Sequence, residues 1–316
     1  MNKRYLKIIL RIVISCLFIG YLFFKVDVSS VAAIMSIIDV GLYVISTLVA
    51  VFSGFIIAGK YYFLIKGSEI KHSLASLVKI NFIARFYALF LPSAVGREVV
   101  RWIKVTHNKN GKAQFLASIV FERLTFLFVL LFCGIIPLFF YESNPEIEIL
   151  RMRVLPIAAV GICLVSAFIL LFIFAPIGDL IQSMAKSTLQ RIRPKLDVDA
   201  FFENHNLKKM NANMFASTLI LSILWQIFFI CRLLVLFKAS SVPLGIMDIT
   251  WIGSMVLLLQ TIPISFAGIG LREGAYAYLF TLFNLAPEKG VLIGILFFSQ
   301  MLIIAFVGGI LEFLEH

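Results

Sequence analysis

One stretch of the chain reads Pro263-Ile264-Ser265-Phe266-Ala267-Gly268-Ile269-Gly270-Leu271-Arg272-Glu273-Gly274, and it interrupts a long apolar region. A helix that only spans a membrane requires no such proline, glycines or Arg-Glu pair. A shorter stretch, Pro92-Ser93-Ala94-Val95-Gly96-Arg97-Glu98, repeats the order of proline, serine, alanine, glycine and Arg-Glu, with Arg101 one turn later. We interpret the rest of the chain as a scaffold that brings these two broken segments together inside a bilayer.

The composition is that of a polytopic membrane protein. Of 316 residues, 61% are hydrophobic and 14% are charged, whereas a soluble domain has roughly half apolar and a quarter charged residues. The 28 basic and 17 acidic residues give a net charge of +11. The basic residues gather in short connections, so the positive-inside rule explains the excess better than nucleic-acid binding. No pattern of aromatic and basic residues indicates nucleic acid either.

Hydropathy predicts an all-α fold with about six full transmembrane helices. A spanning helix needs about 20 predominantly apolar residues. The segments that qualify are 8–24, 40–65, 115–140, 154–175, 214–237 and 291–311. Two further regions are apolar but interrupted: 74–91 carries charged residues, and 249–285 divides at the quoted stretch into two short pieces. We expect these two regions to form re-entrant or broken helical hairpins.

The distribution of Lys and Arg predicts the orientation. Region 59–114 holds ten of them and loop 176–213 holds six, so we place both, with the two termini, in the cytoplasm. Segment 74–91 then enters from the cytoplasm and turns at 92–96. Region 238–290 carries only three basic residues, so its hairpin enters from outside.

This layout predicts an inverted repeat within a single membrane domain, 1–316. In the half that covers about 1–145, three spans run out, in and out, with a hairpin before the third. In the half that covers about 150–316, three spans run in, out and in, again with a hairpin before the third. Inverted-topology repeats of this kind are typical of secondary transporters.

The quoted stretch predicts an anion site. Irregular backbone in lipid persists only where it is buried in protein or lines a wet cavity. Gly268 and Gly270 allow a tight turn, and a half-helix beginning near Gly270 would present free N–H groups and a positive dipole end. Arg272 adds a full charge, and an arginine fork suits a lipid phosphate. The alternative is a surface loop with turn-forming glycines.

Charged residues elsewhere in apolar segments extend the candidate site. Arg97 and Arg101 are four apart and share a helix face, although they could also be ordinary cytoplasmic basic residues. Glu122 and Arg123 lie about two turns inside a strong span. Neighbours in sequence do not face each other on a helix, so we expect Glu122 to meet Arg97 or Arg101. Arg123 would meet a lipid phosphate or extend to the interface.

Other polar residues receive simpler interpretations. Arg232, near the outer end of its span, is expected to extend its side chain to the interface. Lys79 and Arg85 either line a polar entrance or face the cytoplasm. The four histidines lie in loops or at the terminus, without a partner at ligand spacing. We therefore expect neither a metal site nor a cofactor.

Three motifs in this order resemble a known family. They are Pro-x-x-x-Gly-Arg-Glu at 92–98 followed by Arg101, Phe121-Glu122-Arg123-Leu124, and Pro-x-Ser-x-x-Gly-x-Gly-x-Arg-Glu-Gly at 263–274. Together they resemble the flippase-like transmembrane region of lysylphosphatidylglycerol synthase, over nearly the whole chain. The family usually shows Gly-Asp or a similar pair before the first arginine, where this chain has Arg97-Glu98.

The resemblance implies a multi-pass protein of the bacterial inner membrane that translocates lipids, in the best-understood members an aminoacylated phosphatidylglycerol. Bifunctional members carry a cytosolic aminoacyl-transfer domain after this region, and we expect none here because the sequence stops at His316.

We therefore expect a non-enzymatic translocator of a phospholipid or lipid-linked intermediate, and a homo-oligomer is compatible with this. The arginines Arg97, Arg101 and Arg272 would hold phosphate, and Glu122 and Glu273 would either balance them or bind a cationic head group such as a lysyl amine. The predicted substrate-binding residues are Arg97, Arg101, Glu122, Arg123, Ser265, Gly268, Gly270, Arg272 and Glu273.

Two alternatives stay open. One is a membrane-embedded transferase that acts on a lipid phosphate, with Glu122 or Glu273 as base. The sequence shows no convincing acid/base pair or metal cluster, which argues against it. The other is an accessory subunit that transports nothing by itself.

Overall fold

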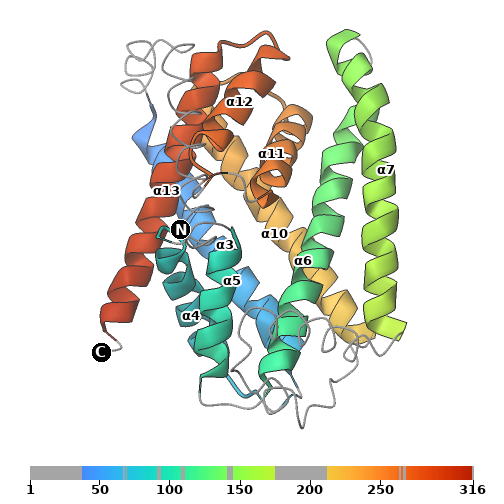
Figure 1. Cartoon of the computed structure of the whole chain (residues 1–316). Coiled ribbons are helices and arrows are strands. Elements are labelled where there is room, and N and C mark those ends of the chain that lie inside the picture. Colours follow the sequence, from blue (N-terminus) through green and yellow to red (C-terminus); the bar gives the residue numbers. More distant parts are fainter. Residues whose placement is uncertain are drawn as a thin grey trace, which may run out of the picture.

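The computed structural model describes residues 38–66, 68, 70–90, 94–107, 111–140, 145–174, 212–262, 265 and 268–314. Five helices in this part of the chain are long and apolar enough to cross a membrane. They are α3 (Val40–Ile65), α6 (Lys112–Ile135) continued by the 3₁₀ helix η1 (Ile136–Phe140), α7 (Pro145–Phe174), α10 (Ala212–Ala239) and α13 (Pro287–Phe313) (Figure 1). The predicted all-helical polytopic fold is confirmed. The predicted span 8–24 and most of loop 176–213 lie outside the described residues.

Two pairs of short helices complete the fold. The first pair is α4 (Leu74–Tyr87) and α5 (Ala94–Thr106), and the second is α11 (Ile246–Thr261) and α12 (Leu271–Thr281). At a rise of 1.5 Å per residue these helices are about 16–24 Å long, less than the roughly 30 Å of a bilayer core. In Figure 1, α4 and α5 occupy the lower half and α11 and α12 the upper half. The regions predicted as hairpins are therefore pairs of short helices at opposite ends, while the inverted repeat stays a prediction.

The break before α12 is a glycine turn followed by a capped helix start. Gly268 and Gly270 have φ angles of 76° and 79°, which glycine adopts without the steric cost of a side chain. The Gly270 N–H donates to Glu273 Oε2 at 2.7 Å. A carboxylate three residues into a helix satisfies an otherwise free donor in this way.

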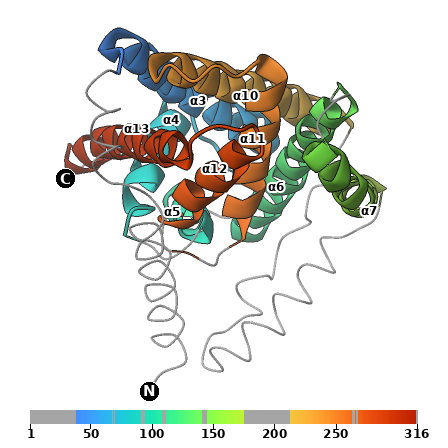
Figure 2. The same cartoon turned by 90° about the horizontal axis from the view of Figure 1, so that it is seen from above.

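Of the three apolar clusters in the described residues, the two larger ones each surround one pair of short helices. The core around α11 and α12 includes Trp251, Ile252, Tyr276, Phe280 and Phe297. The core around α4, α5 and α6 includes Tyr61, Leu64, Leu77, Phe115 and Phe121. Helices α3 and α10 pack side by side, as both views show (Figures 1 and 2). Figure 2 also shows α7 at the edge of the bundle, where it packs against α6.

Helix α13 joins the two pairs of short helices through glycines. A Cβ at Gly290 would lie 2.6 Å from the carbonyl oxygen of Tyr276 in α12. A Cβ at Gly308 would lie 2.0 Å from the carbonyl oxygen of Phe82 in α4. Small residues permit such close helix approach in membranes. Helix α13 therefore fixes α12 and α4 relative to each other by backbone contact.

We predict that Gly308→Ala destabilises the protein, because its methyl group would collide with backbone that has to shift. Overpacking of this kind typically costs about 1–3 kcal/mol. Thermal unfolding of the purified protein in detergent measures the effect. Gly274→Ala is the matched control, since a Cβ there has no neighbour within 4 Å. Equal unfolding temperatures for the two variants would show that the contact between α13 and α4 is looser than described.

We also predict that a cysteine at Lys71 and one at Asn284 react from opposite sides of the membrane. Both positions are exposed, Lys71 next to α4 and Asn284 next to α12. The variants are made after the native cysteines are replaced, and an impermeant maleimide is applied to intact and to opened cells. Reaction of both cysteines from one side would contradict the entry of the two hairpins from opposite faces.

Candidate functional site

A cavity of about 240 Å³ lies where the inner ends of the two pairs of short helices meet. Ala88 and Arg97 line it from the end of α4 and the start of α5, and Thr261 and Gly268 line it from the end of α11 and the turn before α12. Side chains from α3, α6, α10 and α13 complete the wall. One water takes roughly 30 Å³ in the liquid, so the cavity has room for a polar head group.

The wall of this cavity is strongly positive. Among the described residues, six basic side chains and two carboxylates line it. The basic ones are Lys60, Arg85, Arg97, Arg101, Arg123 and Arg232, and the acidic ones are Glu98 and Glu122. The excess is four positive charges. Ionisable groups within a membrane are costly and usually mark a substrate or ion pathway.

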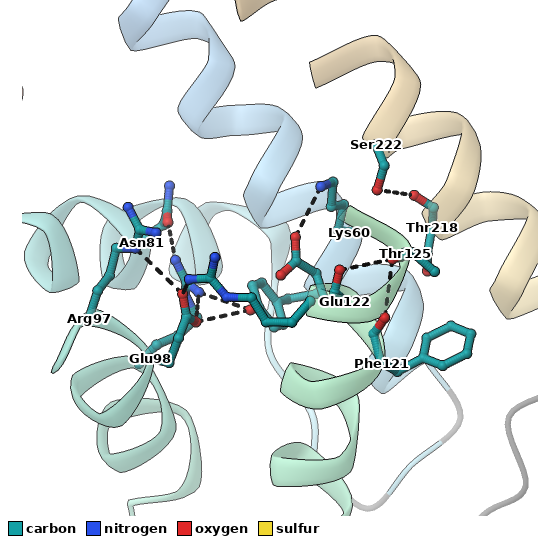
Figure 3. A network of polar contacts seen from close by, with 12 residues as sticks. Lys60, Asn81, Arg97, Glu98, Phe121, Glu122, Thr125, Thr218 and Ser222 are labelled. Carbon is teal, nitrogen blue, oxygen red and sulfur yellow. Dashed lines mark hydrogen bonds and ion pairs between the residues drawn. The ribbon is translucent and has the colours of Figure 1, made fainter. Parts of the chain in front are cut away.

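The Glu98 carboxylate is the centre of the charge network (Figure 3). It accepts hydrogen bonds from the guanidinium groups of Arg97, Arg101 and Arg123 and from the Tyr61 hydroxyl, the last at 3.1 Å. A carboxylate offers about four lone-pair sites. Four donors from α3, α5 and α6 therefore saturate Glu98.

The three arginines around Glu98 are held to different degrees. Arg101 is 3% exposed and also donates to Asn81 Oδ1 at 2.7 Å and to the Tyr61 hydroxyl at 2.9 Å. Asn81 in turn donates to the Gly54 carbonyl at 2.9 Å, which ties α4 to α3. The Arg97 and Arg123 side chains are 32% and 30% exposed. Among the described residues Glu98 is their one ionic partner, so both can turn away from it more easily than Arg101 can.

Glu122 pairs with Lys60, and this corrects the expectation that it meets Arg97 or Arg101. Lys60 Nζ donates to Glu122 Oε1 at 3.0 Å and lies 5.6 Å and 5.9 Å from the ring centres of Phe126 and Trp225. Lys60 belongs to region 59–114, which the charge distribution places in the cytoplasm, but it lies inside α3 with 1% exposure. The apolar run that continues past it to Ile65 was the signal for burial.

Arg232 and Arg85 also differ from their simplest interpretations. The prediction that Arg232 extends to the interface is wrong, because Arg232 is 9% exposed and lines the cavity. Its Nε donates to Gln300 Oε1 at 2.7 Å, and its guanidinium carbon lies 3.8 Å from the Phe297 ring centre. Arg85 lines the cavity from the last turn of α4, as one of its two interpretations allowed.

Arg272 lies one layer behind the wall. It is 1% exposed, pairs with Glu273, and its guanidinium carbon is 5.1 Å from the Phe298 ring centre. Because Glu273 also accepts from the Gly270 N–H, the helix start that we expected to be free for an anion is engaged by a carboxylate of its own helix.

The structure thus divides the predicted substrate-binding residues into two groups. Those on the cavity wall are Arg97, Arg101, Glu122, Arg123, Ser265 and Gly268. Those that do not line it are Gly270, Arg272 and Glu273. The predicted set left out Glu98, although the quoted motif contains it, and the spacing of three residues between Glu98 and Arg101 was the signal for it.

We predict that Glu98→Gln strongly destabilises the protein, because three buried or half-buried arginines lose their shared carboxylate. Removing one partner of a buried ion pair typically costs about 3–5 kcal/mol. The double variant Glu98→Gln/Arg123→Gln should lose less stability than the two single variants lose in sum, since one of the cations left without a carboxylate is removed. Unfolding in detergent gives all three values, and strict additivity would contradict the network.

Comparisons with known proteins agree with the resemblance in the motifs. The model of the family described as the lysylphosphatidylglycerol synthase TM region matches residues 8–309. A search of curated proteins and a search of solved structures each found no match. Because the family model covers nearly the whole chain, this protein belongs to the lysylphosphatidylglycerol synthase TM region family, a family of multi-pass membrane proteins of lipid metabolism or lipid flipping.

Proposed function

We propose that this protein translocates a phospholipid or a lipid-linked intermediate across the bacterial cytoplasmic membrane, with both termini in the cytoplasm. One observation carries the proposal. A cavity with an excess of four positive charges lies inside the apolar helix bundle, between two pairs of short helices that occupy opposite ends of it. Such a cavity suits the phosphate of a lipid head group while the acyl chains remain in the bilayer.

The arrangement suggests how a head group passes. The α4–α5 pair separates the cavity from one membrane face, and the α11–α12 pair separates it from the other. Movement of one pair away from the cavity would open it to one face, and movement of the other pair would open it to the opposite face. Transporters with broken helices at a central site alternate access in this manner.

Glu98 stands in for the substrate while the cavity is empty of lipid. It neutralises part of the charge of Arg97, Arg101 and Arg123. A phosphate offers the same kind of acceptor, and arginine binds phosphate and carboxylate with the same fork. On binding, Arg97 and Arg123 turn toward the phosphate, while Arg101 stays with Glu98, Tyr61 and Asn81.

The positions of Arg97 and Arg272 indicate different roles, one in head-group binding and the other in the placement of helices. Arg97 reaches the cavity, whereas Arg272 connects the start of α12 to the aromatic residues of α13. We therefore assign Arg97 to head-group binding and Arg272 to the placement of the α11–α12 pair.

We predict that Arg97→Gln lowers the translocation rate at least about tenfold without unfolding the protein, since one charge-assisted hydrogen bond to phosphate is lost. The assay uses proteoliposomes with acyl-labelled phosphatidic acid and phosphatidylglycerol, and measures the labelled lipid accessible to dithionite. Arg153→Gln on the exposed side of α7 is the control. Wild-type protein that moves neither of these lipids nor a labelled polyprenyl diphosphate would overturn the proposed function, and a chemically altered lipid would favour a transferase.

We further predict that Arg272→Gln reduces transport through loss of structure. The variant should unfold at a lower temperature than Arg97→Gln, because it leaves Glu273 without its buried partner. Unfolding in detergent compares the two proteins directly. A fully stable Arg272→Gln protein that has lost transport would instead place Arg272 among the residues that bind the head group.

A further inference from the structure

Two of the six basic side chains on the cavity wall have no carboxylate partner in the described part of the chain: Arg85 and Arg232. The other four share Glu98 or Glu122. The two come from different parts of the fold, since Arg85 belongs to α4 and Arg232 to α10.

Arg85 is the less satisfied of the two. It makes no hydrogen bond or ion pair with any residue that the structure describes, and its Nε is buried without an acceptor. Its guanidinium carbon lies 5.9 Å from the Phe82 ring centre. The charged groups that act on it are Arg97, Arg101 and Arg232, all of them positive. An arginine in such surroundings needs an anion that this part of the chain does not supply.

Arg232 is held in place by neutral groups alone. Its Nε donates to Gln300, and its Nη2 donates to the Phe297 carbonyl at 3.4 Å. Gln300 is fixed in turn by a bond of 2.9 Å to the Ser46 hydroxyl. Arg232 Nη1 makes no hydrogen bond within the described residues. The neutral contacts orient the guanidinium and leave its charge uncompensated.

The charges on the wall determine what the cavity can neutralise. Lys60 and Glu122 balance each other. Glu98 offsets one of its three arginines, which leaves two charges there, and Arg85 and Arg232 add two more. A phosphodiester head group with one negative charge would leave three positive charges uncompensated. A head group with a net positive charge would increase the excess of positive charge. Uncompensated charge is costly in a low-dielectric interior.

We propose that the head group bound in this cavity carries at least two negative charges, as a lipid phosphomonoester or diphosphate does, and that Arg85 and Arg232 bind it together with Arg97 and Arg123 and supply the preference for the second charge. This inference rests on the proposed function, because it assumes that the cavity is where the transported lipid binds. It excludes aminoacylated and zwitterionic lipids as preferred substrates of this protein.

The test is equilibrium binding to the full-length protein in nanodiscs, by competition against a fluorescent phosphatidic acid. The competitors are a polyprenyl diphosphate, phosphatidic acid, phosphatidylglycerol, lysyl-phosphatidylglycerol and inorganic pyrophosphate. Measurements at pH 8 and again at a higher pH vary the fraction of phosphatidic acid that is doubly charged, because neighbouring anionic head groups raise the pKa of its second proton. We expect the first two lipids to bind at least about tenfold more tightly than phosphatidylglycerol, and lysyl-phosphatidylglycerol to bind most weakly.

Substitutions connect this selectivity to the two arginines. Arg85→Gln should weaken the binding of phosphatidic acid at least about tenfold and the binding of phosphatidylglycerol much less, which removes the preference for the doubly charged lipid. Arg85→Lys should retain part of it, and Arg153→Gln should bind as the wild type does. Since Arg85 makes no hydrogen bond in the described residues, its replacement by Gln leaves no partner there without its hydrogen bond. Arg232→Gln should act in the same direction, and Arg85→Gln decides the test if Arg232→Gln fails to fold.

The outcomes separate this inference from the proposed function. Selective binding of the doubly charged lipids without any transport would overturn the function and support the inference. Transport of phosphatidylglycerol or lysyl-phosphatidylglycerol as fast as phosphatidic acid would support the function and overturn the inference. Pyrophosphate that competes as tightly as the lipids would overturn the assignment to a lipid.

Discussion

The interaction of one carboxylate with three guanidinium groups is the constraint on which the interior of this protein depends. Glu98 and Arg101 come from α5, Arg123 from α6 and Tyr61 from α3. Arg101 depends on this carboxylate most, because it is almost fully buried and would otherwise be an unpaired charge in an apolar bundle. The position of α5, a helix too short to cross the bilayer, therefore follows from electrostatics as much as from apolar contact.

Much of the fold could be predicted because lipid imposes simple rules. Apolar length located the ends of α3, α6, α10 and α13 within a few residues, and the glycines of 268–270 marked the start of α12. The short helices were recognisable because Arg85, Arg97 and Arg272 interrupt apolar sequence at places where a plain span would carry no charge. These signals are local, so one sequence is enough to detect them.

The partners within the site could not be predicted, because they depend on which helix faces lie together. Lys60 lies near the end of α3, and only the packing of α3 against α6 brings it to Glu122. Arg232 was assigned to the interface from its position along a helix, but Gln300 and Phe297 of α13 hold it inward. The sequence predicts that Glu273 balances the arginines of the site, and Glu273 does pair with the adjacent Arg272, but the bond that it accepts from the backbone of its own turn needed the structure.

The glycines of α13 have a mechanical consequence. At Gly290 the helix touches the backbone of α12, and at Gly308 it touches the backbone of α4, with no side chain between them that could change rotamer and absorb a displacement. A shift of either short helix must therefore move α13, and α13 passes that shift to the other end of the bundle. In the proposed translocation cycle, such coupling would make the position of one end of the bundle depend on the position of the other.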